Sequence, residues 1–87
     1  MAFVYILRCS DDSFYVGKTT DLRVRLDEHQ AGVAANFTAI RRPVEMVYAE
    51  EHQTLQQAEV REQQIKRWSR AKKEALIDQD LRRLKRM

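Results

Sequence analysis

Two short runs of β-branched and aromatic residues open the chain, at residues 3–9 and 13–18. Asp11 and Asp12 lie between the runs and are residues that favour turns. This pattern predicts two strands joined as a β-hairpin. The first run is too short to cross a bilayer and has no basic residue before it, so the sequence predicts neither a membrane span nor a signal peptide.

The length of the hairpin loop decides which side chains share a face, because side chains alternate along a strand. A three-residue loop would pair Ser10 with Phe14. Tyr5 and Tyr15 would then lie on the same face of the hairpin, with Gly17 beside them. A four-residue loop would put the two tyrosines on opposite faces. We expect the odd loop.

Apolar residues at helical spacing follow the hairpin. Leu22, Leu26 and His29 recur at i, i+4 and i+7, which predicts a helix over about residues 21–31 that ends at Gly32. The rest of the chain continues to alternate between helix and strand. The further expected elements are a turn of helix around Phe37, a strand over residues 44–50, a helix from the Thr54 capping box to about Trp68, a helix over residues 70–77 that Ser69 caps, and a basic helix or tail over residues 79–87.

The order β-β-α-β-α-α indicates an α/β domain over residues 1–78, with a small three-stranded, antiparallel-type sheet flanked by helices. Within the third strand, alternation should place Val44, Met46 and Tyr48 on one face. At 87 residues and 10.3 kDa the chain has room for one domain. Leu, Ile, Val and Phe make up about 24% of it, which is enough for a folded core.

Cysteine content and charge narrow the picture further. Cys9 is the single cysteine, which excludes an internal disulfide and a thiolate zinc site and fits a cytoplasmic protein. Residues 61–87 hold ten Lys and Arg and four Asp and Glu, so this segment carries +6 and the remainder −3. Such a segment can attract a polyanion such as nucleic acid, although an ordinary solvated helix face has the same pattern.

The helix that begins at Thr54 carries a charge where its apolar stripe should continue. Between Ala58 and Ile65 the helical period requires an inward residue at position 61 or 62, and the sequence has Arg61 and Glu62. An unpaired carboxylate on a core face is strongly destabilising. We therefore expect a cation beside Glu62, either Arg25 or a metal ion, and a purely structural ion pair would meet the same need.

The two tyrosines and the first helix can meet in one place. Tyr5, Tyr15 and Gly17 would form a pocket in which phenol oxygens contact a ligand that approaches the backbone closely. Arg25 lies one turn before His29 on the same side of the first helix, so both can point at this pocket. Ordinary packing also explains each of these residues taken alone.

Together these residues resemble the GIY-YIG nuclease superfamily. The resemblance spans residues 3 to about 77 and rests on Val4-Tyr5-Ile6, on Tyr15-Val16-Gly17 ten residues later, and on Lys18, Asp21-Leu22, Arg25-Leu26 and a helical Glu62. The chain is most similar to the small stand-alone branch of this superfamily, which consists of bacterial proteins with little beyond the nuclease domain. Val4 and Val16 stand where the name motif has Gly and Ile, and both are apolar.

The resemblance implies hydrolysis of a phosphodiester bond, assisted by one divalent cation. Tyr5 and Tyr15 match the motif tyrosines, Gly17 the motif glycine, Arg25 the helix arginine and Glu62 the metal-binding carboxylate, while Lys18 and His29 match polar positions near the site. The family often has an Asn in the helix after the glutamate. This chain has no clear counterpart, which leaves the handling of the leaving group open.

The side chains suit this chemistry by their own properties. Arg25 can clamp a phosphate, and a lone carboxylate at Glu62 suits one Mg²⁺ or Mn²⁺ ion whose other ligands are water and phosphate. A phenol is a poor base at neutral pH, but Lys18, Arg25 or the metal would favour its ionised form. Tyr5 or Tyr15 would then deprotonate the attacking water. We favour Tyr5 for this role, with Tyr15 orienting water or phosphate.

We therefore expect a metal-dependent DNA endonuclease of the structure-dependent or repair and recombination type, as a monomer or weak dimer. The basic residues expected to contact nucleic-acid backbone are Arg41, Arg42, Lys66, Arg67, Arg70, Lys72 and Lys73. Two alternatives stay open. The domain is a nucleic-acid-binding module with little turnover, or its basic tail is an arm for a protein partner.

Overall fold

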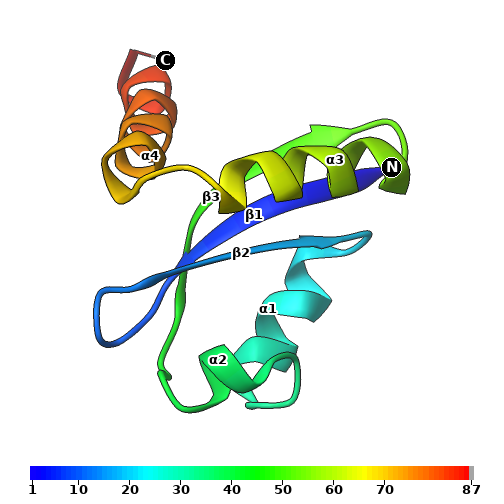
Figure 1. Cartoon of the computed structure of the whole chain (residues 1–87), viewed down its shortest axis with the longest axis vertical. Coiled ribbons are helices and arrows are strands. Elements are labelled where there is room, and N and C mark those ends of the chain that lie inside the picture. Colours follow the sequence, from blue (N-terminus) through cyan, green and yellow to red (C-terminus); the bar gives the residue numbers. More distant parts are fainter. Residues whose placement is uncertain (87) are drawn as a thin grey trace.

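A three-stranded antiparallel sheet forms the centre of the molecule, and helices cover both of its faces (Figure 1). The computed structural model describes the backbone of residues 1–86 and the side chains of residues 1–79. The strands are β1 (Ala2–Arg8), β2 (Phe14–Thr19) and β3 (Glu45–His52), in the spatial order β2-β1-β3. The helices are α1 (Leu22–Gln30), α2 (Asn36–Ala39), α3 (Leu55–Lys66) and α4 (Arg70–Arg86). The predicted fold class is confirmed, and α2 is the expected turn of helix around Phe37.

Each face of the sheet has its own apolar layer. Val4 and Val16 point to the face covered by α3, and Tyr5 and Tyr15 point to the face covered by α1. In Figure 1, α3 accordingly lies on one side of the sheet and α1 and α2 on the other. β1 is the central strand and is buried on both faces, which is why residues 4–7 form an unbroken apolar run.

In the hairpin, Tyr5 and Tyr15 share a face as predicted, but the loop is longer than predicted. Arg8 pairs with Phe14, so residues 9–13 form the loop. The predicted pairing of Ser10 with Phe14 is therefore wrong by two positions. The acidic turn residues lie within a wider loop, in which Asp12 has a left-handed conformation with φ 69°. Because the loop still has an odd number of residues, the two tyrosines share a face as predicted.

β3 departs from simple alternation at a β-bulge. Ile6 pairs with Tyr48 and Leu7 with Met46, so Val47 is the extra residue. Tyr48 therefore packs on the α3 face together with Val47, whereas Met46 packs on the α1 face. The prediction that Met46 and Tyr48 share a face is wrong, because an alternating pattern does not reveal an inserted residue.

The C-terminal part of the chain forms a single helix. α4 runs without interruption over Arg70–Arg86, in place of a helix over residues 70–77 followed by a separate basic segment. Met87, the last residue of the predicted tail, lies outside the described residues. In the described part of the chain, no helix combines the length and apolar character needed to cross a bilayer.

Two adjacent charged residues fix the rotation of α3 above the sheet. Arg61 reaches β3, where its Nε lies 3.0 Å from a carboxylate oxygen of Glu50. Glu62 points to β2, where its carboxylate lies 3.4 Å from the ammonium group of Lys18. The charge predicted on the core face is therefore present, and Glu62 is only 7% exposed. The two ion pairs hold α3 across the sheet and place Glu62 at the edge formed by β2.

Glu50 accepts hydrogen bonds from three side chains. Tyr48 donates at 2.6 Å, His52 contacts the carboxylate through Nε2 at 2.6 Å, and Arg61 donates at 3.0 Å. Burial on its own raises the pKa of Glu50, but these three contacts together outweigh burial and lower the pKa below the ordinary glutamate value.

Glu50→Gln should lower the free energy of unfolding at pH 7 by about 1–3 kcal/mol, because a charged acceptor is lost. The folded pKa is lowered, so this contribution is present above about pH 4.3, the ordinary glutamate value, and is lost as the pH falls through the folded pKa. Urea denaturation at neutral and acidic pH measures both effects. Glu51→Gln, at the exposed neighbouring residue, is the matched control, and equal destabilisation by the two variants would contradict the prediction.

Candidate active site

Tyr5 and Tyr15 lie side by side on the face covered by α1, with ring centroids 6.5 Å apart. Gly17 pairs with Tyr5 across the hairpin, and the tyrosine ring covers it. A Cβ at position 17 would lie 2.5 Å from Cζ of Tyr5 and would also overlap its hydroxyl oxygen. The close approach that we predicted for a ligand at Gly17 is therefore made by the Tyr5 ring, and a side chain there would displace the phenol.

A chain of buried hydrogen bonds leads from Tyr5 to α2. The Tyr5 hydroxyl lies 2.7 Å from Nε2 of His29, and Nδ1 of His29 lies 2.8 Å from Oγ1 of Thr38. Thr38 in turn donates to the carbonyl oxygen of Ala35 at 3.2 Å. Tyr5 is 2% exposed and His29 and Thr38 are 0% exposed, so the chain is closed to solvent along its length.

The hydrogen bonds assign the tautomer of His29. The Thr38 hydroxyl uses its one proton toward Ala35, so it accepts from His29, and Nδ1 carries the imidazole proton. Nε2 is then the acceptor for the Tyr5 O–H. Burial lowers the pKa of His29, and the nearby Arg25 guanidinium lowers it further. His29 is therefore neutral at pH 7, and its Nε2 accepts the hydrogen bond from the Tyr5 hydroxyl.

The expectation that Lys18 or Arg25 brings the phenol pKa down into range is wrong, and the same role for a metal ion stays a prediction. Burial raises the pKa of both Tyr5 and Tyr15, and the negative charge of Glu62 raises both as well. Arg25 lowers both values, by less than burial raises them. The same charges nevertheless act on both phenols, so the guanidinium, the carboxylate and the two tyrosines form one electrostatic environment.

One donor of Arg25 has no acceptor among the side chains and backbone groups that the structure describes. The guanidinium lies 3.6 Å from Glu28 through one terminal nitrogen, while Nε is buried without a hydrogen-bond partner in this part of the chain. A buried, unpaired guanidinium N–H is costly, and it is typical of a group whose acceptor arrives with a ligand. An oxygen of a phosphate group is the matching acceptor.

Glu62 has cations on both of its oxygens, and Arg25 is not one of them. Lys18 lies 3.4 Å from Oε1, and Lys66 lies 3.6 Å from Oε2. Of the cations expected beside Glu62, Arg25 is therefore wrong, the ion pair is made by lysines, and the metal ion stays a prediction. The side chain of Glu62 is only 9% exposed, so its carboxylate has to be neutralised, and the two ammonium groups do this together.

The carboxylate of Glu62 also fits the divalent ion that the resemblance implies. No group of three or more His, Cys, Asp or Glu side chains suited to a metal occurs among the residues that the structure describes. A hard ion such as Mg²⁺ is often held by one carboxylate plus water and substrate phosphate, and Glu62 provides such an oxygen donor. Lys18 and Lys66 would have to move from the carboxylate when the ion binds.

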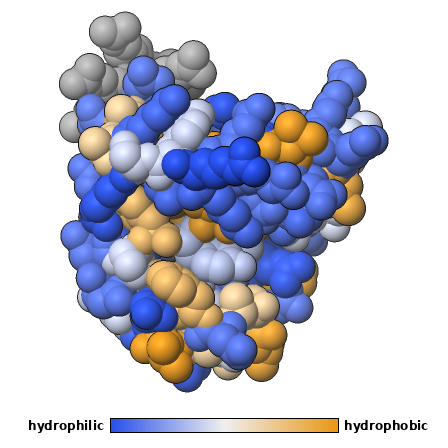
Figure 2. All heavy atoms as spheres, in the orientation of Figure 1, coloured by the Kyte–Doolittle hydropathy of each residue, from blue (hydrophilic) through white to orange (hydrophobic). Residues whose placement is uncertain are grey.

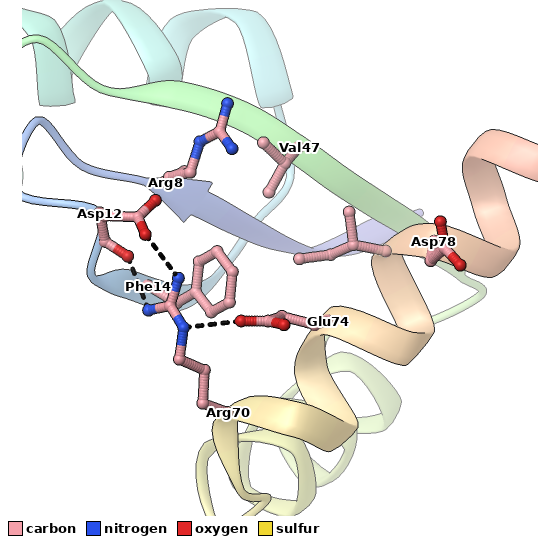
Figure 3. A pocket seen from close by; sticks show the side chains of 8 residues that line it. Arg8, Asp12, Phe14, Val47, Arg70, Glu74 and Asp78 are labelled. Atoms are coloured by element: carbon pink, nitrogen blue, oxygen red, sulfur yellow. Dashed lines mark hydrogen bonds and ion pairs between the residues drawn. The ribbon is translucent and has the colours of Figure 1, made fainter.

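The predicted nucleic-acid contacts do not form one basic stripe. Arg70 lines a separate pocket of about 280 Å³ between the hairpin loop and α4. Its guanidinium lies 3.1 Å from Asp12 and 2.7 Å from Glu74 and stacks 4.2 Å from the centre of the Phe14 ring (Figure 3). Arg70 is therefore already neutralised by carboxylates.

Other basic residues from the prediction are spread over the surface. Arg41 pairs with Asp11 at 3.0 Å, and Arg42 donates to backbone carbonyl groups at the ends of α1 and α2. Lys72 lies over an indole ring at 4.3 Å, and Arg67 is exposed. Their contact with nucleic acid stays a prediction.

Sequence reasoning missed two partners in the site. No local pattern in the sequence points to Thr38, because its role depends on α2 folding back onto α1. The sequence analysis expects Lys66 at nucleic acid, although Lys66 follows Glu62 by four residues and this spacing on a helix predicts the ion pair.

Residues 1–75 match the family model of the GIY-YIG catalytic domain. The chain therefore belongs to the GIY-YIG family. It is 45% identical over 75 residues to the UPF0213 proteins SAV0488 and SA0446 of Staphylococcus aureus (strains Mu50 and N315), with 86% of this chain and 92% of each relative covered. The solution NMR structure of the UPF0213 protein BH0048 from Bacillus halodurans is 38% identical, with a TM-score of 0.58 and coverage of 90% of this chain and 84% of that chain.

Thr38→Val should change the tautomer of His29, because it removes the acceptor for Nδ1–H and keeps the side-chain volume. The ¹⁵N chemical shifts of the imidazole report which nitrogen carries the proton. The wild-type protein should show Nδ1–H, the valine variant a mixture with Nε2–H, and Thr38→Ser should restore the wild-type spectrum. Nε2–H as the main form of wild-type His29 would contradict the assignment.

Proposed function

We propose that this protein is a divalent-metal-dependent endonuclease that hydrolyses DNA phosphodiester bonds, acting on branched, flapped or damaged structures. The observation that carries the proposal is the buried hydrogen bond between Tyr5 and His29 beside a second tyrosine, with Arg25, whose Nε is buried without a partner among the described residues, on the same helix as His29. Membership of the GIY-YIG family supports the nuclease class.

Proton transfer from water follows the direction of the buried hydrogen bonds. Tyr5 is 2% exposed, so substrate binding has to open its hydroxyl to one water molecule. The Tyr5 oxygen then accepts a proton from this attacking water while the phenol proton passes to Nε2 of His29. This coupled transfer avoids a free phenolate, which the raised pKa of Tyr5 makes unfavourable. Thr38 keeps Nδ1–H in place, so His29 becomes an imidazolium while Tyr5 ends the step as a neutral phenol. As the water oxygen bonds to phosphorus, the bond from phosphorus to the leaving oxygen breaks, and this oxygen takes a proton from solvent water.

The remaining groups bind and orient the phosphodiester. Arg25 donates its unpaired Nε–H to a non-bridging oxygen, where negative charge accumulates as the water attacks. Tyr15 places its hydroxyl beside the reacting phosphate. It neither gives nor takes a proton in this scheme. A divalent ion held by Glu62 would neutralise charge on the phosphoryl and leaving oxygens.

The second candidate function is a nucleic-acid-binding module with little turnover. The observation that favours it is the pairing of Glu62 with Lys18 and Lys66. The two ammonium groups occupy the carboxylate oxygens that a metal ion would need to bind. The chain also has no clear counterpart of the family Asn. Such a module would bind nucleic acid in a salt-dependent way and release no product.

Cleavage of labelled flap, nicked, branched and single-stranded DNA with Mg²⁺ or Mn²⁺ tests the first proposal. Tyr5→Phe and Glu62→Gln should each reduce the rate by about 10²–10⁴-fold, the range expected for loss of an acid-base or charge-stabilising group. Because His29 must be neutral, the rate should fall as the pH drops through its lowered pKa, below about 6.5.

Arg25→Ala and Arg23→Ala provide a matched pair, since both remove one positive charge from α1. Only the first should abolish cleavage, because Arg23 is exposed and no role in the site is assigned to it. Cleavage that survives Tyr5→Phe or Glu62→Gln, or binding without product in any metal, would overturn the endonuclease proposal. The second of these results favours the binding module.

A further inference from the structure

A small pocket opens at the outer edge of the sheet, immediately beside Tyr15. β2 is an edge strand, and the pocket lies along it, with α2 on one side and the junction of α3 and α4 on the other. Its volume is about 210 Å³. The lining residues are Phe14, Tyr15, Val16, Phe37, Lys66 and Lys73. The proton-transfer scheme does not use this pocket, although Tyr15, which is placed beside the reacting phosphate, also lines it.

One side of the pocket is aromatic. The Phe37 ring lies 6.0 Å from the Tyr15 ring at an interplanar angle of 30°, and the Arg41 guanidinium lies 4.0 Å from its centre. These contacts hold a phenylalanine that is nevertheless 37% exposed. Val33 and Ile40 nearby in sequence are also exposed, and Figure 2 shows apolar surface gathered around the α1 and α2 end of the molecule.

The other side of the pocket is cationic. Lys66 stands at the end of α3, half exposed, and Lys73 lies in the first turns of α4. Aromatic rings next to ammonium groups match the two parts of a nucleotide, since the base stacks on the rings and the phosphate meets the cations. A base within a duplex has both faces covered by its neighbours. Only an unpaired base can therefore present a face to Phe37 and Tyr15.

We propose that this pocket is a subsite for one unpaired nucleobase next to the phosphate held by Arg25. It makes the substrate a single strand, or a single-stranded segment of a branched or flapped DNA. This inference rests on the proposed function for the position of the phosphate. α2 then has two roles, because Thr38 faces His29 while its neighbour Phe37 faces the base.

Fluorescence anisotropy with a fluorescein-labelled thymidine 12-mer tests the subsite by binding alone, in buffer with EDTA to prevent turnover. The wild-type protein should bind this strand more tightly than the same backbone with abasic positions, and more tightly than a duplex of equal length. Phe37→Leu keeps apolar bulk but removes the aromatic face, so it should weaken binding about 5- to 100-fold, the loss of one stacked base. Phe37→Trp should restore binding.

Salt dependence separates stacking from charge. Phe37→Leu should leave the slope of log Kd against log salt unchanged, whereas Lys73→Ala should reduce it by about 0.7 for the loss of one phosphate contact. Val33→Ala is the matched control, an exposed apolar residue outside the pocket, and should bind as the wild type does. Circular dichroism confirms that each variant is folded before its affinity is compared.

Equal affinity for the intact and abasic strands, unchanged affinity in Phe37→Leu, or tighter binding of the duplex would each overturn the subsite. If the protein cleaves DNA but shows one of these results, the endonuclease proposal stands and the subsite fails. If the base-dependent binding is present and no metal supports cleavage, the subsite stands and the endonuclease proposal fails. If the protein binds none of the three nucleic acids, the subsite is overturned.

Discussion

The hydrogen bond between Tyr5 and His29 is the contact on which the site depends. Each of its polar groups is almost completely buried, and a buried hydroxyl or imidazole without a partner costs about 1–3 kcal/mol. The contact therefore forces the sheet, α1 and α2 into one arrangement, with Thr38 completing the chain. Gly17 makes this possible, because only a residue without a side chain leaves room for the Tyr5 ring.

A second constraint acts from the opposite face of the sheet. Arg61 and Glu62 are adjacent on α3 and diverge to β3 and β2, so the helix is held across the sheet rather than along one strand. The charge of the Glu62 carboxylate raises the pKa of both tyrosines, although α3 packs on one apolar layer of the sheet and the tyrosines belong to the other. The site is therefore formed where the two layers meet, at the edge strand β2. In the protein without ligand, the negative charge of Glu62 is neutralised by lysines, while Arg25 keeps one N–H donor for a ligand.

The sequence predicts most of the framework, because its signals are local. The parity of the hairpin loop, the charge facing the core at Glu62 and the end of α1 near Gly32 follow from period and turn chemistry, and Gly32 has the left-handed φ of 80° expected there. The register of the hairpin and the bulge at Val47 do not follow, because the pattern of apolar residues does not count an added residue in a loop or strand.

The chemistry of the site is less visible in the sequence, because it depends on contacts between distant segments. The resemblance identifies the tyrosines, Arg25 and Glu62, but it does not say which cations neutralise the acid or how the phenol loses its proton. The structure answers the first question through the contacts of Lys18 and Lys66 with Glu62. For the second, it shows that burial raises the pKa of Tyr5 and lowers that of His29, and that the two side chains share a hydrogen bond. Thr38 has no motif around it and acquires its role only when α2 packs against α1.

Paramagnetic broadening by Mn²⁺ is the measurement that tests most directly whether these groups form one metal-assisted site. The ¹⁵N-labelled Tyr5→Phe variant, mixed with a short DNA strand, is titrated with substoichiometric Mn²⁺ while the backbone amide signals are recorded. The account predicts selective broadening around Lys18, Glu62 and Lys66. This broadening should disappear in the double variant that combines Tyr5→Phe with Glu62→Gln. Broadening centred elsewhere, or unchanged by the loss of this carboxylate, would contradict it.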